Sequence, residues 1–423
     1  MSARSARPVD TLPKPEPRPD RPLPLGTLRV VDFTRFLSGP WCTQTLADLG
    51  AEVIKIENPG IGDETRTFVP PEIAGESPYF LGVNRNKKSI ALDLRAEAGL
   101  AVALDLVRGA DILVQNFSDG AADRLGLSWD AVRAINPRLI YCTISGWGSG
   151  SALAGQPGFD SVFQAESGFA SLTGDPDRLP MRTGTPIIDI TASMNATIAI
   201  LAALAVRDRL GIGQHVEVAL YDTAVTLLAY FGMNYLASGK DYVRQGNTAP
   251  VATPIGMFAC GDGKAIYVSC GTQRSWEQLA AGVLARPEWL TDPRFATHQA
   301  RNRNQKELMA LIGEVFTTAP RDHWMERVHR EKVPAGAVRS VAETFASAVA
   351  GERRLATRLD HPSGEPVPNI ASPFRFSETP VAAPVAAPRL DADRLHVLTD
   401  ILGYDAARIA TPDAGGAFGG RQL

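Results

Sequence analysis

The feature that most constrains the fold is an alternation of short β-rich runs with helical stretches between residues 28 and 220. The run at 28–33 (LRVVDF) is typical of a buried strand, and 41–49 predicts a short helix that ends at Gly50. The predicted strands lie at 28–33, 52–56, 89–92, 112–115, 139–144 and 216–220. Because helical stretches separate most of these strands, the pattern predicts an α/β fold with a largely parallel, doubly wound, Rossmann-like sheet covered by helices on both faces.

The alternation stops near residue 225, which predicts a smaller domain in the middle of the chain. Residues 257–269 predict a β-hairpin around Gly261-Asp262-Gly263. Helices are expected at 274–284, 303–317 and 321–331. We therefore expect a large α/β domain built from both chain ends, at 26–225 and 333–423, and a small α+β domain at 226–332.

Both ends of the chain have compositions that predict little regular structure. Residues 1–25 carry prolines among charged residues, at positions 8, 13, 15, 17, 19, 22 and 24. This composition favours an extended, disordered arm without a core of its own. The glycine-rich residues 414–420 predict a loose tail.

Composition and charge exclude several classes of function. The chain is 44% hydrophobic and 21% charged with a net charge of -3, which gives no electrostatic basis for binding nucleic acid or an anionic membrane. Its four cysteines form no CxxC pair, so we expect reduced thiols, no zinc site and a cytoplasmic location. The apolar stretch 187–206 contains Asp189 and Asn195, which favours a buried helix over a membrane span. No apolar run follows Arg4 and Arg7, so no secretory signal is expected.

Common cofactor and nucleophile motifs are absent from the sequence. The turn after the first predicted strand reads TRFLSGP rather than GxGxxG, which disfavours a dinucleotide site. Neither a GxxxxGK[ST] loop nor a GxSxG elbow occurs. His323 and His329 share a predicted helix with Glu326, but their spacing is not HExxH, so we expect a solvated helix face and no metal.

Three groups of polar residues remain as candidates for function. The basic segment 84–88 (NRNKK) fits either a solvated loop or a loop that contacts phosphate, and Arg95 and Arg124 fit the second role. Asp160 and Asp189 are the two carboxylates that stand out. Asp189 begins the long apolar helix, where an aspartate commonly caps free N–H groups, so residue type alone does not separate a cap from a catalytic group.

A set of short motifs, which follow one another along the chain, helps to decide among the roles considered for these polar residues. They are VDFT at 31–34, GP at 39–40, LGAEVIKIE at 49–57, GD at 62–63, NRNKKSIALDL at 84–94, VQNF at 114–117, LGL at 125–127, NPR at 136–138, GWG at 146–148 and PGFD at 157–160. Over about residues 26–380 the chain resembles the class III CoA-transferases and their close relatives, the α-methylacyl-CoA racemases. The motifs are specific as a set, although each one is weak alone.

The resemblance implies a fold, a nucleophile and a substrate. Two subunits would interlock like chain links to form a homodimer, and Asp189 would match the family's nucleophilic aspartate, with Asp160 as active-site support. An acyl-CoA and a free carboxylic acid would be the substrates, and no cofactor would be bound permanently. The residues that would line the CoA channel are Ser38, Leu92, Leu94, Arg95, Asn116, Phe117, Arg124, Pro157 and Phe159.

The implied chemistry divides one exchange into several acyl transfers. The Asp189 carboxylate would attack the thioester, giving a mixed anhydride and a CoA thiolate. The thiolate would then attack the side-chain carbonyl to give an aspartyl-CoA thioester. The incoming acid would attack that thioester, and CoA would return to the new acyl group. Backbone N–H groups at a helix start would stabilise the oxyanions, and water must be kept away from the anhydride.

Two other functions remain as alternatives. The racemases use a histidine in a Gly-His-Asp triplet for two-base proton exchange, whereas this chain has Gly158-Phe159-Asp160, and phenylalanine cannot exchange a proton. That difference favours a transferase. A non-catalytic acyl-CoA binding protein is the second alternative, since Asp189 would also persist as a helix cap.

Departures from the family pattern bear on the substrate. Relatives that use formyl-CoA and oxalate carry a glycine-rich loop where this chain has residues 249–254, which include two prolines. They also carry a Gln where this chain has Leu37 and an Arg where it has Asn58. These differences disfavour oxalate. The stretches 62–68 and 247–258 are more similar to transferases that use succinyl-CoA and dicarboxylic acids, with a monocarboxylic acid left open.

Overall fold

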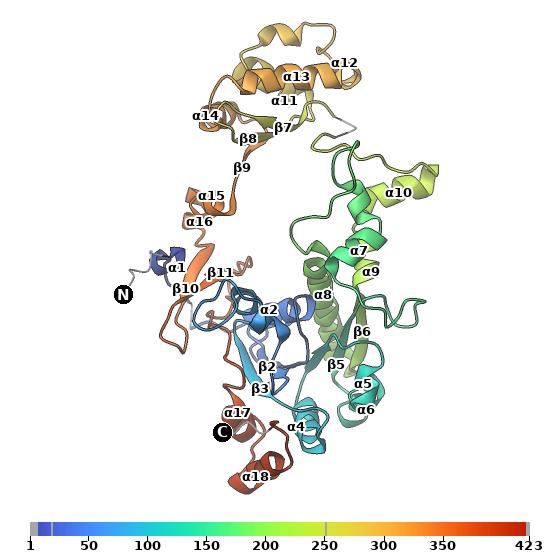
Figure 1. The fold of residues 1–423 in the computed structure, drawn as a ribbon, viewed down its shortest axis with the longest axis vertical. Helices are drawn as coiled ribbons and strands as arrows, with labels where there is room; N and C mark the ends of the chain where they lie inside the picture. The colour runs from blue at the N-terminus through green and yellow to red at the C-terminus, as the bar shows by residue number, and fades with distance from the viewer. Residues whose placement is uncertain (1–6, 18–19, 250–251, 420–423) are drawn as a thin grey trace. The chain divides into compact units, whose positions relative to one another are not determined.

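The computed structural model describes residues 7–17, 20–249 and 252–419, and these form two compact units (Figure 1). Unit 1 comprises the described parts of 1–167, 184–229 and 348–423, and unit 2 comprises those of 168–183 and 230–347. Unit 2 thus takes in a segment at 168–183 that the alternation of strands does not reveal, and it extends beyond residue 332.

Unit 1 is built on a six-stranded sheet in which every strand is parallel to its neighbours, in the order β3-β2-β1-β4-β5-β6. The strands are β1 (Arg29–Asp32), β2 (Glu52–Glu57), β3 (Lys87–Ala91), β4 (Ile112–Gln115), β5 (Ile140–Ser145) and β6 (Gln214–Ala219). The parallel α/β sheet predicted from the sequence is therefore confirmed. The chain leaves β1 toward β2 on one side and later returns to β4 on the other, so the strand order reverses between β1 and β4.

Helices cover the sheet because its central strands are apolar on both faces. One core cluster joins strand residues such as Val31, Ile54 and Leu113 to α4 (Glu97–Arg108) and α6 (Trp129–Ile135). The helices α2 (Ser38–Asp48) and α8 (Ile187–Leu210) pack against each other and against strands of the same sheet, and they contribute no residue to that cluster (Figure 1). They form the second layer.

The remaining elements of unit 1 are short. The helices and helical turns are α1 (Pro8–Thr11), Glu64–Thr67, α3 (Pro78–Val83), α5 (Ala121–Arg124), α7 (Asp160–Glu166), α9 (Leu220–Thr226), α16 (Ala348–Glu352), α17 (Arg394–His396), Val397–Ile401 and α18 (Ala406–Ala414). The strands β10 (Ala356–Leu359) and β11 (Val367–Ile370) pair in antiparallel fashion.

Helix α8 is the one helix in the described part of the chain that is long and apolar enough to cross a bilayer. It packs against α2, β5 and β6, and Ile188, Ala196 and Ile200 on its inner side are buried. Its apolar composition thus agrees with the predicted core helix, and its first turn carries Asp189.

Unit 2 combines a small antiparallel sheet with helices. The strands β7 (Ile255–Ala259) and β8 (Ala265–Ser269) form the predicted hairpin, and β9 (Ala335–Val338) pairs with β8. The helices and turns are Phe169–Leu172, α10 (Ala229–Ser238), α11 (Gln273–Glu277), Gln278–Val283, Pro287–Leu290, α12 (His298–Arg303), α13 (Gln305–Phe316), α14 (Arg321–Glu331) and α15 (Val341–Phe345). Buried aromatic residues, Trp276, Phe316 and Trp324 among them, hold these elements together.

The two ends of the chain differ from their predicted disorder. In the described residues 7–17, Val9 is buried in a cluster with Leu359 and Val367, and Arg358 N donates to Pro13 O. In the C-terminal tail, Phe418 is 1% exposed and belongs to the main core cluster of the sheet. Both predictions are wrong for these residues, because local composition does not reveal apolar surfaces that lie far away in the sequence.

Replacing Phe418 with alanine should therefore destabilise unit 1 by about 3–5 kcal/mol, the usual cost of removing a buried aromatic ring. The change removes contacts with the sheet core and with the Arg394 guanidinium, which lies 4.3 Å from the ring centroid. Urea unfolding measures the effect. Phe376→Ala, at a side chain that is 41% exposed, is the matched control and should cost less than about 1 kcal/mol. Equal losses for the two variants would contradict the buried tail.

Candidate active site

Asp189 lies at the edge of a cavity of about 760 Å³ within unit 1. The cavity walls come largely from segments that follow β1, β4 and β5, together with the first turn of α8. The strand order reverses between β1 and β4, and the crevice at such a reversal is where open α/β sheets bind their ligands. The sheet topology therefore places a ligand-sized cavity beside Asp189.

The structure brings together about half of the predicted channel residues. Those that line the cavity with Asp189 are Ser38, Asn116, Phe117, Pro157 and Phe159. The others, Leu92, Leu94, Arg95 and Arg124, do not line it. Leu92 is buried in the sheet core and Leu94 packs against it, whereas Arg95 and Arg124 are exposed.

The basic segment at 84–88 has neither of the two roles considered for it. The Arg85 guanidinium forms a buried ion pair with Asp48, and Lys87 Nζ lies 3.0 Å from Asp32 Oδ2 with both side chains fully buried. Lys88 pairs with Glu52. These side chains neutralise carboxylates inside unit 1, so they are neither a solvated loop nor free to contact phosphate.

Asp160, rather than Asp189, caps the long helix. Asp160 Oδ2 accepts hydrogen bonds from the backbone N–H groups of Ile188, at 2.7 Å, and of Asp189, at 3.1 Å. Asp160 Oδ1 accepts from the side-chain amide of Gln164, which holds the cap in place. Two of the N-terminal N–H groups of α8 are thus satisfied by a residue of α7, and the carboxylate of Asp189 is left available to the cavity.

The surroundings of Asp189 favour its protonated form. Burial, and then the negative charge of Asp160, raise the pKa of Asp189 from 3.8 to about 7, against a hydrogen bond from the Ser38 side chain that lowers it. Burial, and then the negative charge of Asp189, also raise the pKa of the Tyr79 phenol, to about 12. Near neutral pH, Asp189 therefore exchanges between carboxylic acid and carboxylate, and Tyr79 remains a neutral hydroxyl.

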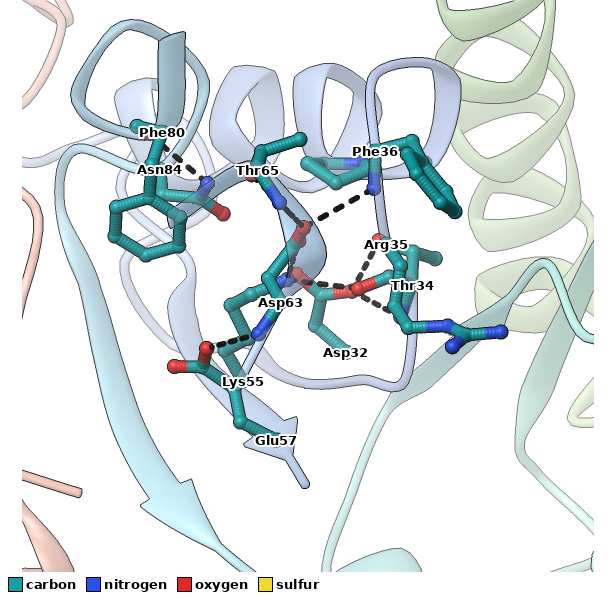
Figure 2. A network of polar contacts seen from close by, with 12 residues as sticks. Asp32, Thr34, Arg35, Phe36, Lys55, Glu57, Asp63, Thr65, Phe80 and Asn84 are labelled. Atoms are coloured by element: carbon teal, nitrogen blue, oxygen red, sulfur yellow. Dashed lines mark hydrogen bonds and ion pairs between the residues drawn. The ribbon is translucent and has the colours of Figure 1, made fainter. Parts of the chain in front are cut away.

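A buried charge network supports the turn between β1 and α2, the turn that leads to Ser38 (Figure 2). Lys55 Nζ lies 3.0 Å from Asp63 Oδ2, with both side chains inaccessible to solvent, and it donates to Thr34 O at 2.7 Å. Burial alone would lower the pKa of Lys55, but the charges of Asp32 and Asp63 outweigh burial and the pKa is raised. Lys55 is therefore a permanent cation beneath this turn.

The part of the cavity formed by the sheet face carries residues that sequence reasoning missed. The ring of His215 stacks on Trp129, with centroids 6.2 Å apart, and meets Tyr141 edge-to-face at 5.2 Å, and His215 Nε2 is 2.8 Å from Thr143 Oγ1. Burial lowers the pKa of His215. These residues come from α6, β5 and β6 and share no motif. The available signal was the run of polar residues at alternate positions of two strands, 143 and 145 on β5 and 215 and 217 on β6.

Within the described ranges, no group of three or more His, Cys, Asp or Glu side chains is arranged to hold a metal ion. His323, Glu326 and His329 are exposed on α14, as predicted for a solvated helix face, and the ring of His323 contacts Trp324 edge-on. The chemistry that the cavity itself offers is therefore that of a carboxylate with an adjustable charge, flanked by a hydroxyl donor and aromatic rings.

The chain is similar to known CoA-transferases. The family model described as CoA-transferase family III matches residues 25–394. The succinate–glutarate CoA-transferase of Agrobacterium fabrum is 36% identical over 93% of this chain and 99% of its own length. The acetyl-CoA:oxalate CoA-transferase of Acetobacter aceti is 40% identical over 76% of this chain and 82% of its own. A CaiB/BaiF family protein from Brucella suis, known from its crystal structure, is 38% identical, with a TM-score of 0.82 over 90% of this chain and all of the other.

Proposed function

The chain belongs to CoA-transferase family III, and on that premise we propose that Asp189 carries first the acyl group and then CoA from an acyl-CoA donor to a free carboxylic acid. One observation carries the proposal: Asp160 caps α8, so the Asp189 carboxylate faces a large cavity without being engaged by its own helix. A carboxylate used as a cap would be a poor nucleophile, because its lone pairs would be held by backbone N–H groups.

Each step has a group in the cavity that suits it. The ionised Asp189 attacks the thioester carbonyl, which forms a mixed anhydride and releases the CoA thiolate. The thiolate attacks the Asp189 carbonyl carbon, and the donor acid leaves as a carboxylate. The acceptor carboxylate attacks the aspartyl thioester, and a second thiolate attack restores Asp189 and forms the new acyl-CoA. Helix α2 starts without a side-chain cap at Ser38, which lines the cavity, and we assign stabilisation of the oxyanions to the backbone N–H of Ser38.

The two alternative functions fit this cavity less well. A racemase needs a second titrating base beside Asp189, and the position that holds histidine in the racemases is Phe159 here. His215 lines the cavity but is stacked on Trp129 and hydrogen-bonded to Thr143. A binding protein would have no need of a buried carboxylate with a raised pKa, which is a feature typical of reactive groups.

For the substrates, we propose succinyl-CoA as donor and a dicarboxylic acid as acceptor. Support comes from the relatives named succinate–glutarate and succinyl-CoA:glutarate CoA-transferase, the second at 32% identity over 90% of this chain for the human protein. Leu37, Asn58 and the prolines near 249–254 argue against oxalate, although Pro250 lies outside the described residues. The acetyl-CoA:oxalate relative nevertheless keeps oxalate among the acceptors to be tested.

The test is a substrate panel with detection of product thioesters by mass spectrometry. Succinyl-CoA or acetyl-CoA would be incubated with glutarate, oxalate, mesaconate and a monocarboxylic acid, and glutaryl-CoA is the product expected to form fastest from succinyl-CoA. A parallel reaction in D₂O with a 2-methylacyl-CoA measures α-proton exchange. Exchange of the α-proton without any new thioester would overturn the proposal in favour of a racemase.

We also propose that the enzyme is an interlocked homodimer in the cytoplasm. In support, α8 exposes Met194 and Ile198, and α10 exposes Tyr230 and Leu236, which are apolar surfaces suited to a partner subunit. All four cysteines are free and buried, as expected for a reducing compartment. Light scattering coupled to gel filtration tests the dimer, and a monomer at micromolar concentration would contradict it.

Asp160→Asn should move the pH dependence of transfer to lower pH. Because Asp189 must be ionised to attack, kcat of the unmodified enzyme should rise with pH through about 7. Asparagine keeps an oxygen that can accept the α8 N–H groups but removes the charge that raises the pKa of Asp189, so the rising limb should shift by about one pH unit. Asp119→Asn, which changes a cavity carboxylate that does not act on Asp189, is the control. An unshifted limb in Asp160→Asn would contradict the assigned role.

A further inference from the structure

Phe36 has a backbone conformation that aromatic residues rarely adopt. Its φ is +67°, in the left-handed region where a side chain crowds the backbone and glycine is favoured. Such conformations persist where surrounding contacts enforce them, and they are concentrated at functional sites. Phe36 lies between the end of β1 and the start of α2, two residues before Ser38.

Two sets of contacts hold this turn from opposite sides. Directly after β4, the Asn116 side-chain amide accepts from Arg35 N at 2.9 Å and donates to Arg35 O at 2.8 Å. From β2, Lys55 Nζ donates to Thr34 O (Figure 2). Asn116, expected from the resemblance to line the CoA channel, thus also fixes the backbone next to Phe36. The enforced conformation decides where the Phe36 ring points.

The ring of Phe36 meets that of Phe159 inside the cavity. The centroids are 5.7 Å apart and the ring planes are inclined at 77°, an edge-to-face contact. Phe159 directly precedes Asp160, the cap of α8, and Phe36 is joined through Leu37 to Ser38, the side-chain donor to Asp189. Both rings line the same cavity as Asp189, and Phe159 is 64% exposed in it.

We propose that Phe36 and Phe159 form an aromatic gate that keeps water from the acyl group on Asp189. The inference rests on the proposed function. Water that attacks the anhydride carbonyl of the acyl group forms a carbon–oxygen bond, expels the Asp189 carboxylate and releases the acyl group as a free acid. The net reaction is acyl-CoA plus water giving acid plus CoA thiol, a loss that a transferase must suppress.

Rings that exclude water and rings that only bind the CoA substrate predict different effects when they are removed. Rings that only bind the CoA substrate would, when removed, slow transfer and hydrolysis together. Rings that exclude water would, when removed, raise hydrolysis relative to transfer, because bulk water gains access to an intermediate that still forms. The ratio of the two rates therefore separates the two roles.

The experiment uses the full-length enzyme with succinyl-CoA, with and without glutarate. Release of CoA thiol without acceptor measures hydrolysis, and formation of glutaryl-CoA measures transfer. Phe159→Ala should raise the ratio of hydrolysis to transfer by about tenfold. Phe36→Gly should do the same, because glycine keeps the left-handed backbone while removing the ring.

The controls separate the gate from the function on which it rests. Phe159→Tyr keeps an aromatic ring and should keep the low ratio. Phe374 and Phe376 form another aromatic pair, 6.2 Å apart and not lining the cavity, so Phe376→Ala should leave the ratio unchanged. If the unmodified enzyme transfers CoA but both gate variants keep its ratio, the gate is wrong and the proposed function stands. If the unmodified enzyme forms no new thioester with any acid of the panel, the proposed function fails first.

Discussion

Replacing Asp189 with alanine should lower kcat for CoA transfer by a factor of about 10⁴ or more, the scale expected when the covalent nucleophile of an acyl transfer is removed. Asp189→Asn should be nearly as inactive, because a neutral amide cannot attack a thioester. The measurement is the initial rate of glutaryl-CoA formation from succinyl-CoA. Asp208→Ala is the matched control, since it removes a carboxylate from the exposed end of the same helix. Retention of more than about one tenth of the activity in Asp189→Ala would contradict the covalent route.

The same substitution should not weaken the fold. The pKa of Asp189 is raised from 3.8 to about 7, so its ionised form is less stable in the folded chain than in the unfolded chain. The charged group therefore destabilises the fold increasingly as pH rises from about 4 to 7, by up to roughly 4 kcal/mol above pH 7. Asp189→Ala removes this penalty, so the variant should be at least as stable as the unmodified enzyme at pH 8, with a smaller gain at pH 5. Lost activity together with retained stability identifies a catalytic group.

The second large effect is expected at Lys55. Lys55→Met should destabilise unit 1 by about 3–5 kcal/mol, because it leaves Asp63 buried without its cation and removes one of the two cations beside Asp32, which keeps Lys87. Methionine has a similar length, so the loss reports charge rather than volume. Urea unfolding measures it, and Lys88→Met is the control: its pair with Glu52 is about 30% exposed and should be worth less than about 1 kcal/mol.

A double substitution separates the ion pair from a general loss of packing. Adding Asp63→Asn to Lys55→Met removes the carboxylate charge that has lost its ion-pair partner, so the double variant should recover part of the lost stability. Full additivity of the two losses would contradict the buried network. The network also holds the turn that carries Phe36, so Lys55→Met should raise hydrolysis relative to transfer in whatever fraction of the protein remains folded.

The sheet was predictable because its signal is local. Runs such as 28–33 and 112–115 are apolar, rich in β-branched residues and separated by helices. Each strand can therefore be predicted from a run of no more than six residues. The burial of the C-terminal tail could not be predicted, because Phe418 packs against strands that lie more than 300 residues away in the sequence. The charges at 84–88 were misjudged for the same reason, since their partner carboxylates lie on α2, β1 and β2.

The candidate site also has features that the sequence predicts and features that depend on contacts between distant residues. Asp189 could be singled out because the resemblance to the class III CoA-transferases matches it to the family's nucleophile, yet its residue type also fitted a helix cap. What separates the two roles is a pair of hydrogen bonds from α8 to Asp160, at 2.7 and 3.1 Å, and no sequence pattern specifies which carboxylate reaches those N–H groups. Likewise, the turn in which Phe36 has a positive φ is held by Lys55 on β2 and by Asn116, which directly follows β4, and no local pattern reveals these contacts.

The central claim is that Asp189 becomes covalently acylated, and trapping with hydroxylamine tests it most directly. The enzyme would be incubated with succinyl-CoA and neutral hydroxylamine, digested, and its peptides analysed by mass spectrometry. We expect a hydroxamate on the side chain of Asp189, formed only in the presence of the acyl-CoA and absent from Asp189→Asn. An enzyme that transfers CoA under these conditions with Asp189 unmodified, or with the hydroxamate on another carboxylate, would contradict the central claim.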